Sequence, residues 1–287
     1  MCHWFNSRQH HKPRKFRGFF VSSGEFLFPR VFVNCVHLRN FLKSMFSLYI
    51  KELKAFLSSI IGYIFIGVFL IVAGLFIWVF PNVNNVLESG LADLQGLFNL
   101  SQFLFLFLVP AITMRSFAEE KRTGTMDFLL TLPLTDMQIV WAKFLACLTL
   151  LAIALLPTLV YVITVYWIGN PVGNLDMGST WGSYLGLLFL GASFIAIGLF
   201  SSSLTNNQIV AFIIAALLCF ILSFGFAFIY SFEALGNFGY YLKTLGIEHH
   251  YASISQGVID TRDVFYFCSV IFIFLYATRL VLLSRKW

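Results

Sequence analysis

The run IIGYIFIGVFLIVAGLFIWVF, Ile60–Phe80, decides the fold class of this sequence. No Asp, Glu, Lys, Arg or His interrupts it, and about 20 such residues in a helix span the hydrocarbon core of a bilayer. Only 11% of the residues in the chain are charged and 59% are hydrophobic, whereas about 25% are charged in a soluble domain. The run therefore predicts the first span of a membrane protein.

Five further apolar runs complete the pattern. Their bounds are Gly96–Met114, Ile139–Ile168, Trp181–Ser203, Ile209–Ser231 and Val264–Leu283. Lys143 and Arg279 are the charged residues in these runs, and each lies near one end, where we expect its long side chain to reach the interface. The third run exceeds the bilayer core in length, and we expect Pro157 to kink it. The chain is predicted to be an all-α polytopic membrane protein with six transmembrane helices.

Lysine and arginine predict the orientation, because cytoplasmic segments carry an excess of both. From Met45 onward the segments on one side hold Lys51, Lys54, Arg115, Lys121, Arg122, Lys143, Arg279, Arg285 and Lys286. The segments on the other side hold only Lys243 and Arg262. We therefore expect a multi-pass protein with the loop between spans two and three in the cytoplasm and both termini on that side.

Residues 1–44 differ from the rest. They are rich in Lys and Arg with Glu25 as their one acid. A targeting peptide or basic arm, a metal site made by Cys2, His3, His10 and His11, and an upstream extension preceding a start at Met45 are the three interpretations. We expect 1–44 to be a basic extension outside the fold, and 60–287 to form the six-span domain.

Residues 45–59 have the pattern of an amphipathic helix. Their apolar positions recur at helical spacing and are Phe46, Tyr49, Ile50, Leu53, Phe56 and Leu57. Lys51, Lys54 and Ser58 fall on the opposite side. The pattern predicts an interfacial helix that leads into the first span, and the alternative is the first turns of a tilted span.

Signatures of enzymes are absent from the sequence. It has no HExxH, GxSxG or GxxxxGK[ST] pattern, and its cysteines have no ligand spacing. His249 and His250 could form a metal pair, but an exposed polar loop is the commoner reading. We predict that the chain is not an enzyme and binds neither cofactor, metal nor nucleic acid. Since the spans lack midplane charges, any transport should draw its energy from another chain.

The charged stretch EEKRTGTMDFLLTLPLT, Glu119–Thr135, lies between the second and third spans. Thr123, Gly124 and Thr125 predict a turn, after which Met126, Leu129, Leu130 and Pro133 fall on one helical face. Asp127 would lie in the first turn of this short helix, where the dipole favours an acid. Thr135 and Gln138 predict a capping box that starts the third span.

This short helix has two interpretations from its residues alone. It could lie against the lipid as an ordinary loop helix. Alternatively, it could present Leu129 and Leu130 to a groove on a soluble partner.

Two motifs resemble a known family. RSFAEEKRTGTMDFLLTLPLTDMQIVWAKF, Arg115–Phe144, is similar to the loop between spans two and three in permeases of type-2 class ABC exporters. Matching positions are Arg115, Glu119, Glu120, Lys121, Gly124, Thr125, Leu129, Leu130 and Pro133, and Asp127 stands where glutamate is usual. HHYASISQGVIDTRDVFYF, residues 249–267, resembles the stretch before the last span, where Asp260 can cap the final helix on its outer face and Asp263 can support its positive end.

The resemblance implies a short cytoplasmic coupling helix that docks on a separate ATP-binding subunit through Glu119, Glu120, Lys121, Gly124, Thr125, Asp127, Leu129 and Leu130. ATP would be bound by that partner. The permease linked to bacterial gliding motility is most similar, and the permease of nitrous-oxide-reductase maturation, a copper-related system, is a close alternative. Both imply the bacterial inner membrane. A scaffold that anchors an ATPase without moving cargo shares the same features.

Six spans are half of such a transporter, so the resemblance also implies a second permease or auxiliary membrane subunit, together with membrane lipids around both. Small residues in the fourth run would allow close helix approach. They are Gly182, Gly186, Gly191, Ala192, Ala196 and Gly198. They could line a dimer seam or serve packing within one subunit.

Overall fold

A computed structural model describes residues 45–82, 85–90, 92–126, 128, 134–230, 244–257 and 260–284. All of them belong to one compact unit that begins at Phe41. The predictions for residues 1–44, and those for Asp127, Leu129, Leu130 and Pro133, lie outside the described residues.

Six helices are long and apolar enough to cross a membrane, and they run over Ile60–Val79, Gln95–Arg122, Asp136–Ile168, Met177–Leu204, Gln208–Ile229 and Thr261–Leu283. The described ranges contain no strand. The predicted all-α polytopic fold with six spans is confirmed. The second span is longer than predicted, because the charged residues after Met114 continue it as a helix.

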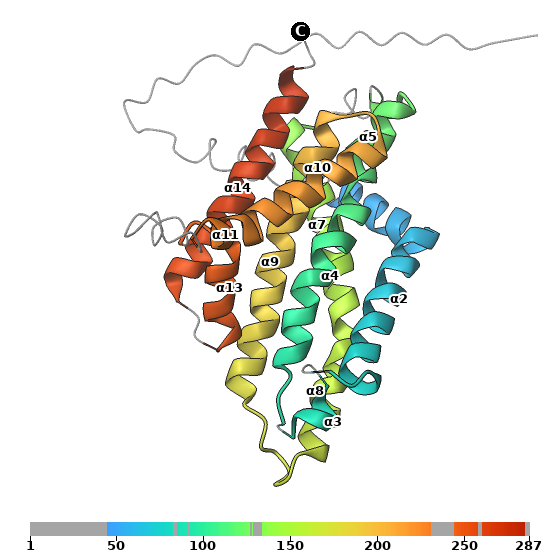
Figure 1. Ribbon diagram of the computed structural model, residues 1–287. Helices are drawn as coiled ribbons and strands as arrows, with labels where there is room; N and C mark the ends of the chain where they lie inside the picture. The colour runs from blue at the N-terminus through green and yellow to red at the C-terminus, as the bar shows by residue number, and fades with distance from the viewer. Residues whose placement is uncertain are drawn as a thin grey trace, which may run out of the picture. The chain divides into compact units, whose positions relative to one another are not determined.

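The helical segments follow one another closely along the chain (Figure 1). Residues 45–58 form a helix that precedes the first labelled one. The labelled segments are α2 (Ile60–Gly74), the π-helical turn η1 (Leu75–Val79), α3 (Val86–Ser89), α4 (Gln95–Thr113), α5 (Arg115–Arg122), α7 (Asp136–Leu155), the 3-10 turn η2 (Leu156–Thr158), α8 (Leu159–Ile168), α9 (Met177–Leu204), α10 (Gln208–Phe220), the π-helical turn η3 (Ile221–Gly225), α11 (Phe226–Tyr230), α13 (Ile247–Ser255) and α14 (Thr261–Leu283).

Local signals in the sequence set several of these boundaries. The predicted capping box starts α7: the Thr135 amide donates to the Gln138 side chain at 2.7 Å, and the Gln138 amide donates to the Thr135 hydroxyl at 3.4 Å. Pro157 lies in η2, where the long third span changes from α-helix to a 3-10 turn. The proline therefore interrupts the α-helix where a kink was expected, because its ring cannot continue the α-helical hydrogen bonds.

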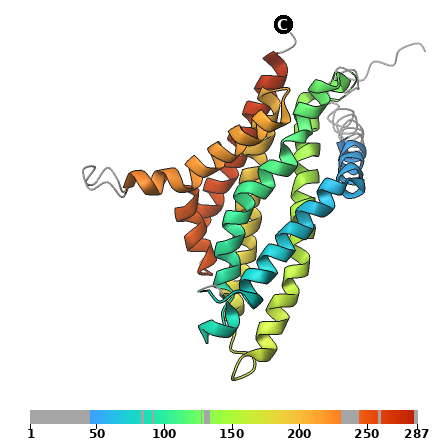
Figure 2. The same cartoon turned by 45° about the vertical axis from the view of Figure 1, so that its right-hand side comes forward.

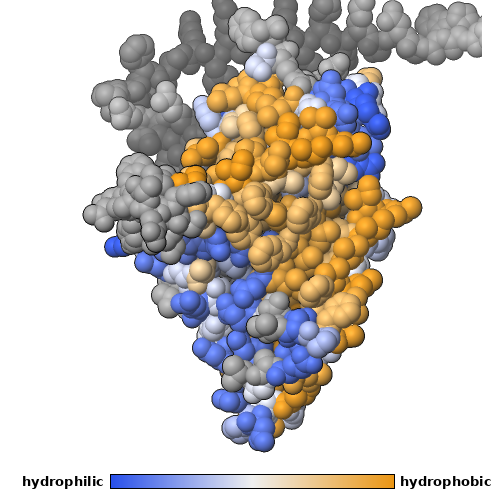
Figure 3. Space-filling view, viewed as in Figure 1, coloured by the Kyte–Doolittle hydropathy of each residue, from blue (hydrophilic) through white to orange (hydrophobic). Residues whose placement is uncertain are grey.

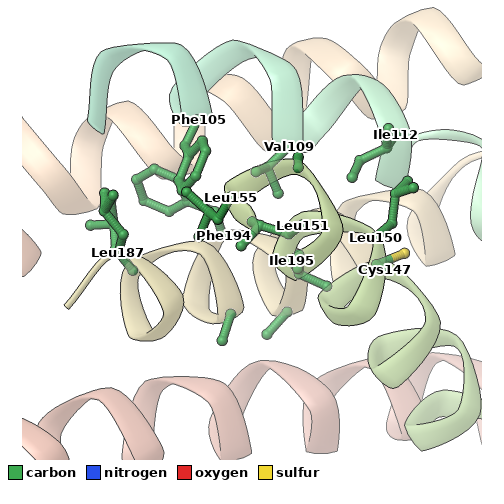
Figure 4. Close-up of a cluster of buried hydrophobic side chains, with 14 of the residues drawn as sticks. Phe105, Val109, Ile112, Cys147, Leu150, Leu151, Leu155, Leu187, Phe194 and Ile195 are labelled. Carbon is green, nitrogen blue, oxygen red and sulfur yellow. The ribbon is translucent and has the colours of Figure 1, made fainter. Parts of the chain in front are cut away.

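Helix α9 lies at the centre of the bundle, with α4 and α7 on one side and α13 and α14 on the other (Figure 1). In its most apolar stretch 78% of residues are buried, against 22% in the span formed by α10 and α11. Apolar side chains of α4, α7 and α9 meet in the core, where Phe105, Leu151 and Phe194 are fully buried (Figure 4). The span of α10 and α11 runs obliquely to the others (Figure 2).

The small residues of α9 are used inside the chain. A Cβ at Gly191 would come within 2.5 Å of Leu151, one at Gly182 within 2.9 Å of the Gly257 Cα, and one at Gly198 would overlap Thr113. Of the two interpretations of these residues, packing within one subunit is the one observed. They allow α4, α7 and the turn after α13 to approach α9 closely.

The surface seen in Figure 3 has a wide apolar region over α10, α4 and α2, whereas polar residues gather at the end where α8 is joined to α9. A lipid-facing surface explains why so many large apolar side chains, such as Ile60, Phe103 and Ile209, are more than half exposed.

Candidate functional site

The candidate site lies at the end of the bundle formed by α5, the start of α7 and the last turn of α9, here called the α5 end (Figure 1). Helix α4 stops at Thr113 and α5 begins at Arg115. Ser202 of α9 fills this break. Its hydroxyl accepts hydrogen bonds from the amides of Phe117 and Ala118, both at 3.0 Å, and donates to the Met114 carbonyl at 2.9 Å. One donor and two acceptor positions are all that a hydroxyl offers, so Ser202 fixes α5 to α9.

Replacing Ser202 with alanine should lower the free energy of unfolding by about 1–3 kcal/mol, because two buried amides and one carbonyl lose their partner. Ser201 is the matched control. It is equally buried, but its hydroxyl bonds only the Ile197 carbonyl of its own helix, so Ser201→Ala should change stability by less than about 0.5 kcal/mol. Equilibrium unfolding in mixed micelles measures both. Equal losses in the two variants would refute the role given to Ser202.

Lys143 of α7 is the centre of the site, and it is only 1% exposed. Its ammonium lies 2.8 Å from Glu120 Oε1, 3.4 Å from Glu52 Oε2 and 2.8 Å from the Ser116 carbonyl. The prediction that this side chain reaches the membrane interface is wrong. The three N–H groups of the ammonium have three acceptors inside the protein, and those partners make burial of the charge tolerable.

Glu52, Glu120 and Lys143, here called the buried triad, come from three separate elements. Glu52 lies in the helix of residues 45–58, Glu120 in α5 and Lys143 in α7. Their side chains are 12%, 19% and 2% exposed respectively. Ionic interactions are strong at such burial, so the triad links the three elements at the α5 end.

Two other charged residues of the EEKR stretch, Glu119 and Lys121, also bind the chain itself. Glu119 pairs with Arg115 one turn earlier, with 2.9 Å from Arg115 Nε to Glu119 Oε2. Lys121 donates to the carbonyl of Ser203 at the end of α9. Glu120 and Lys121 therefore hold α5 against α7 and α9, whereas Glu119 is paired within α5. The part of all three in coupling to a partner stays a prediction.

A tight turn follows α5. Gly124 has a φ of +70°, a conformation that glycine adopts at no steric cost. The hydroxyls of Thr123 and Thr125 lie 2.9 Å apart, and Thr123 also donates to the Glu119 carbonyl. Beyond the turn Met126 is buried, whereas Phe128 is 76% exposed. The segment that carries the predicted coupling helix therefore leaves α5 by a sharp turn that the chain itself stabilises.

The second motif lies away from the α5 end. Asp260 caps α14, accepting from the Arg262 amide at 3.1 Å. Asp263 in the first turn of α14 lies 2.7 Å from His250 Nδ1, and His250 Nε2 is 2.8 Å from the Thr244 carbonyl. The prediction of an exposed polar loop at His250 is wrong, because the His250 ring is mostly buried and stacks on the Tyr266 ring with 4.0 Å between their centroids. Within the described ranges, no group of three or more His, Cys, Asp and Glu could hold a metal ion.

The sequence comparison identifies the family. The profile of the ABC-2 family transporter proteins matches residues 84–245, more than half of the chain, including α4, α5, α7 and α9. The chain belongs to the ABC-2 transporter family. None of the curated proteins compared with it matches.

An ABC-2 permease is the membrane component of a transporter and is not itself the ATPase. The expectation of an ABC permease with an ATP-binding partner is confirmed at the level of the family. The buried triad and Ser202 of this ABC-2 permease were not singled out from the sequence. The sequence shows one lysine inside an apolar run and two glutamates outside the runs. It does not show that they pair, because the pairing depends on contacts between elements that are distant in sequence.

Proposed function

We propose that this chain is the membrane-spanning permease subunit of an ATP-driven exporter-type complex, coupled to a separate ATP-binding subunit through the segment between α5 and α7. The observation that carries the proposal is the buried triad. It connects α5, which leads into that segment, to α7 and to the helix of residues 45–58. A displacement of the segment by a partner would therefore move these helices together, because separating them would expose unpaired charges to a low-dielectric interior.

The proposed orientation places the α5 end in the cytoplasm of a bacterium and the chain in its inner membrane, with both termini cytoplasmic. The asymmetry of Lys and Arg supports it. A second permease or auxiliary membrane subunit would complete the pathway for the cargo. Because the small residues of α9 are covered within this chain, the second subunit would contact other surfaces. The two motifs favour a complex associated with gliding motility.

Affinity purification of the chain from its native membrane tests the proposal. We expect a P-loop ATPase to accompany the wild-type permease, and Leu129→Asp to reduce its recovery by at least about tenfold, because a buried carboxylate at a docking surface costs well over the 1.4 kcal/mol that a factor of ten represents. Leu87→Asp is the matched control. Leu87 is an exposed apolar residue of α3, at the opposite end of the bundle (Figure 1), and its substitution should leave recovery unchanged.

Two outcomes of this purification would count against the proposal. Absence of any P-loop ATPase would leave the permease without a motor, and equal recovery with Leu129→Asp would place the docking surface elsewhere. Cargo movement is tested separately on the recovered complex, because a transporter changes its ATPase rate when substrate is added. A complex whose ATPase rate does not change with any candidate substrate would instead be a scaffold.

A further inference from the structure

A cavity of about 210 Å³ lies between the helix of residues 45–58, the start of α2 and α5. Its wall is mixed. Phe56 and Ile61 supply apolar surface, and the charged side chains in the wall belong to the residues Glu52, Arg115, Glu119, Glu120 and Lys143. The cavity is therefore built on one side by an amphipathic helix and on the other by the charged stretch of α5.

The charges around this cavity do not balance. Three carboxylates face two cations, which leaves a net charge of −1 (2 − 3). Glu120 Oε1 pairs with Lys143, but Glu120 Oε2 is buried and has no hydrogen-bond partner among the described residues. A buried carboxylate oxygen without a donor is costly, so the site is incomplete and would be stabilised by a group with cationic N–H donors.

Arg115 offers further donors in the same wall. It pairs with Glu119 through two contacts, from Nε to Oε2 at 2.9 Å and from Nη2 to Oε1 at 3.1 Å. A guanidinium has five N–H groups, so those not directed at Glu119 can donate to an additional anionic oxygen. One cavity thus offers a carboxylate that lacks a donor and a guanidinium that can donate, which is complementary to a ligand with an ammonium and a phosphate.

The position of the cavity favours a lipid as the source of that ligand. Amphipathic helices that precede a span lie at the level of the headgroups, and the cavity is bounded by such a helix and by the first turns of α2. Phe56 and Ile61 give the apolar contact that the glycerol and upper acyl region of a phospholipid needs. A basic side chain of a protein partner would satisfy Glu120 but would bring no anionic oxygen for the remaining N–H groups of Arg115.

We propose that this cavity binds the headgroup of a phosphatidylethanolamine-type phospholipid, whose primary ammonium donates to Glu120 Oε2 and whose phosphate accepts from Arg115. Phosphatidylcholine carries no N–H and cannot make the first contact. An anionic lipid without an amine would be repelled by the net negative charge of the cavity. The binding itself is independent of the proposed function. A bound lipid would hold the helix of residues 45–58 against α5 and so affect coupling to the ATP-binding subunit. This consequence of binding rests on the proposed function.

The test uses the full-length permease alone, so its outcome is independent of any ATPase. Native mass spectrometry of the protein released from nanodiscs counts the phospholipids retained. We expect phosphatidylethanolamine to be retained about tenfold more than phosphatidylcholine, the effect of one charge-assisted hydrogen bond. Retention should fall as successive methyl groups remove the N–H donors of the ammonium. This series needs no variant, so it stays decisive even where a substitution prevents folding.

Variants locate the site. Glu120→Gln should reduce the preference to less than about twofold, because the amide lacks the negative charge. Glu88→Gln, the same change in α3 at the other end of the bundle, should leave the preference intact. Equal retention of the methylated lipids, or an unchanged preference in Glu120→Gln, would overturn the proposal. Retention of soluble phosphoethanolamine equal to that of the phospholipid would also overturn it, since the free headgroup would then be the ligand.

Discussion

Replacing Lys143 with methionine should lower the free energy of unfolding by about 3–5 kcal/mol, the cost of leaving buried carboxylates without their cation. The methionine side chain fills similar space, so the loss reports charge and not volume. Glu52 and Glu120 would face each other across the vacated position, and the Ser116 carbonyl would lose its donor. Equilibrium unfolding in mixed micelles measures the change.

Two further variants make the experiment specific. Lys54→Met removes an exposed lysine from the helix of residues 45–58 and should change stability by less than about 0.5 kcal/mol. Combining Lys143→Met with Glu52→Gln and Glu120→Gln removes all three charges and should restore most of the loss, because a neutral cluster has no unpaired ion. If Lys143→Met were as stable as Lys54→Met, the triad would not hold the α5 end together.

Replacing Gly198 with alanine should lower the free energy of unfolding by about 1–3 kcal/mol, because the new methyl group would overlap the hydroxyl and the Cβ of Thr113. Thr113 is held by its own hydrogen bond to the Val109 carbonyl at 2.9 Å, so it cannot simply rotate away. Helices α4 and α9 would have to separate close to the point where Ser202 fixes α5. We therefore expect the coupling to the ATP-binding subunit to weaken as the stability falls.

Gly67 in α2 is the matched control, because a Cβ there meets nothing within 4 Å. Gly67→Ala should stabilise the protein by about 0.5–1 kcal/mol, the usual gain from replacing glycine in a helix. The double variant Gly198→Ala with Thr113→Ala should recover part of the loss. Similar stability for the two glycine variants would contradict the close approach of α4 to α9.

The fold could be predicted where the signal is local. Six spans followed from hydropathy, because each helix needs only its own apolar residues to be recognised. The capping box of Thr135 and Gln138 lies within one turn of helix, and Pro157 disrupts its own helix whatever surrounds it. None of these features depends on which helix packs beside which.

The site could be predicted only in part, because it depends on such packing. A lone lysine near the end of an apolar run is expected to reach the interface, and only the return of the helix of residues 45–58 and of α5 toward α7 buries Lys143. The role of Ser202 could not be predicted, because positions 201–203 are all serine and nothing in the sequence tells which of them faces the break between α4 and α5. The motif drew attention to the stretch that contains Glu119, Glu120 and Lys121, but not to the contacts that these three side chains make within the permease.

Site-specific photocrosslinking at position 128 tests the central claim most directly, namely that the segment after α5 docks on a separate ATP-binding subunit. Phe128 is 76% exposed, and Leu87 of α3, at 59%, is the matched position at the other end of the bundle. With a photoreactive phenylalanine analogue, we predict a crosslink from position 128 to a subunit that carries a P-loop, and none from position 87. Crosslinks from position 128 to lipid alone, in membranes that contain the whole complex, would contradict the account.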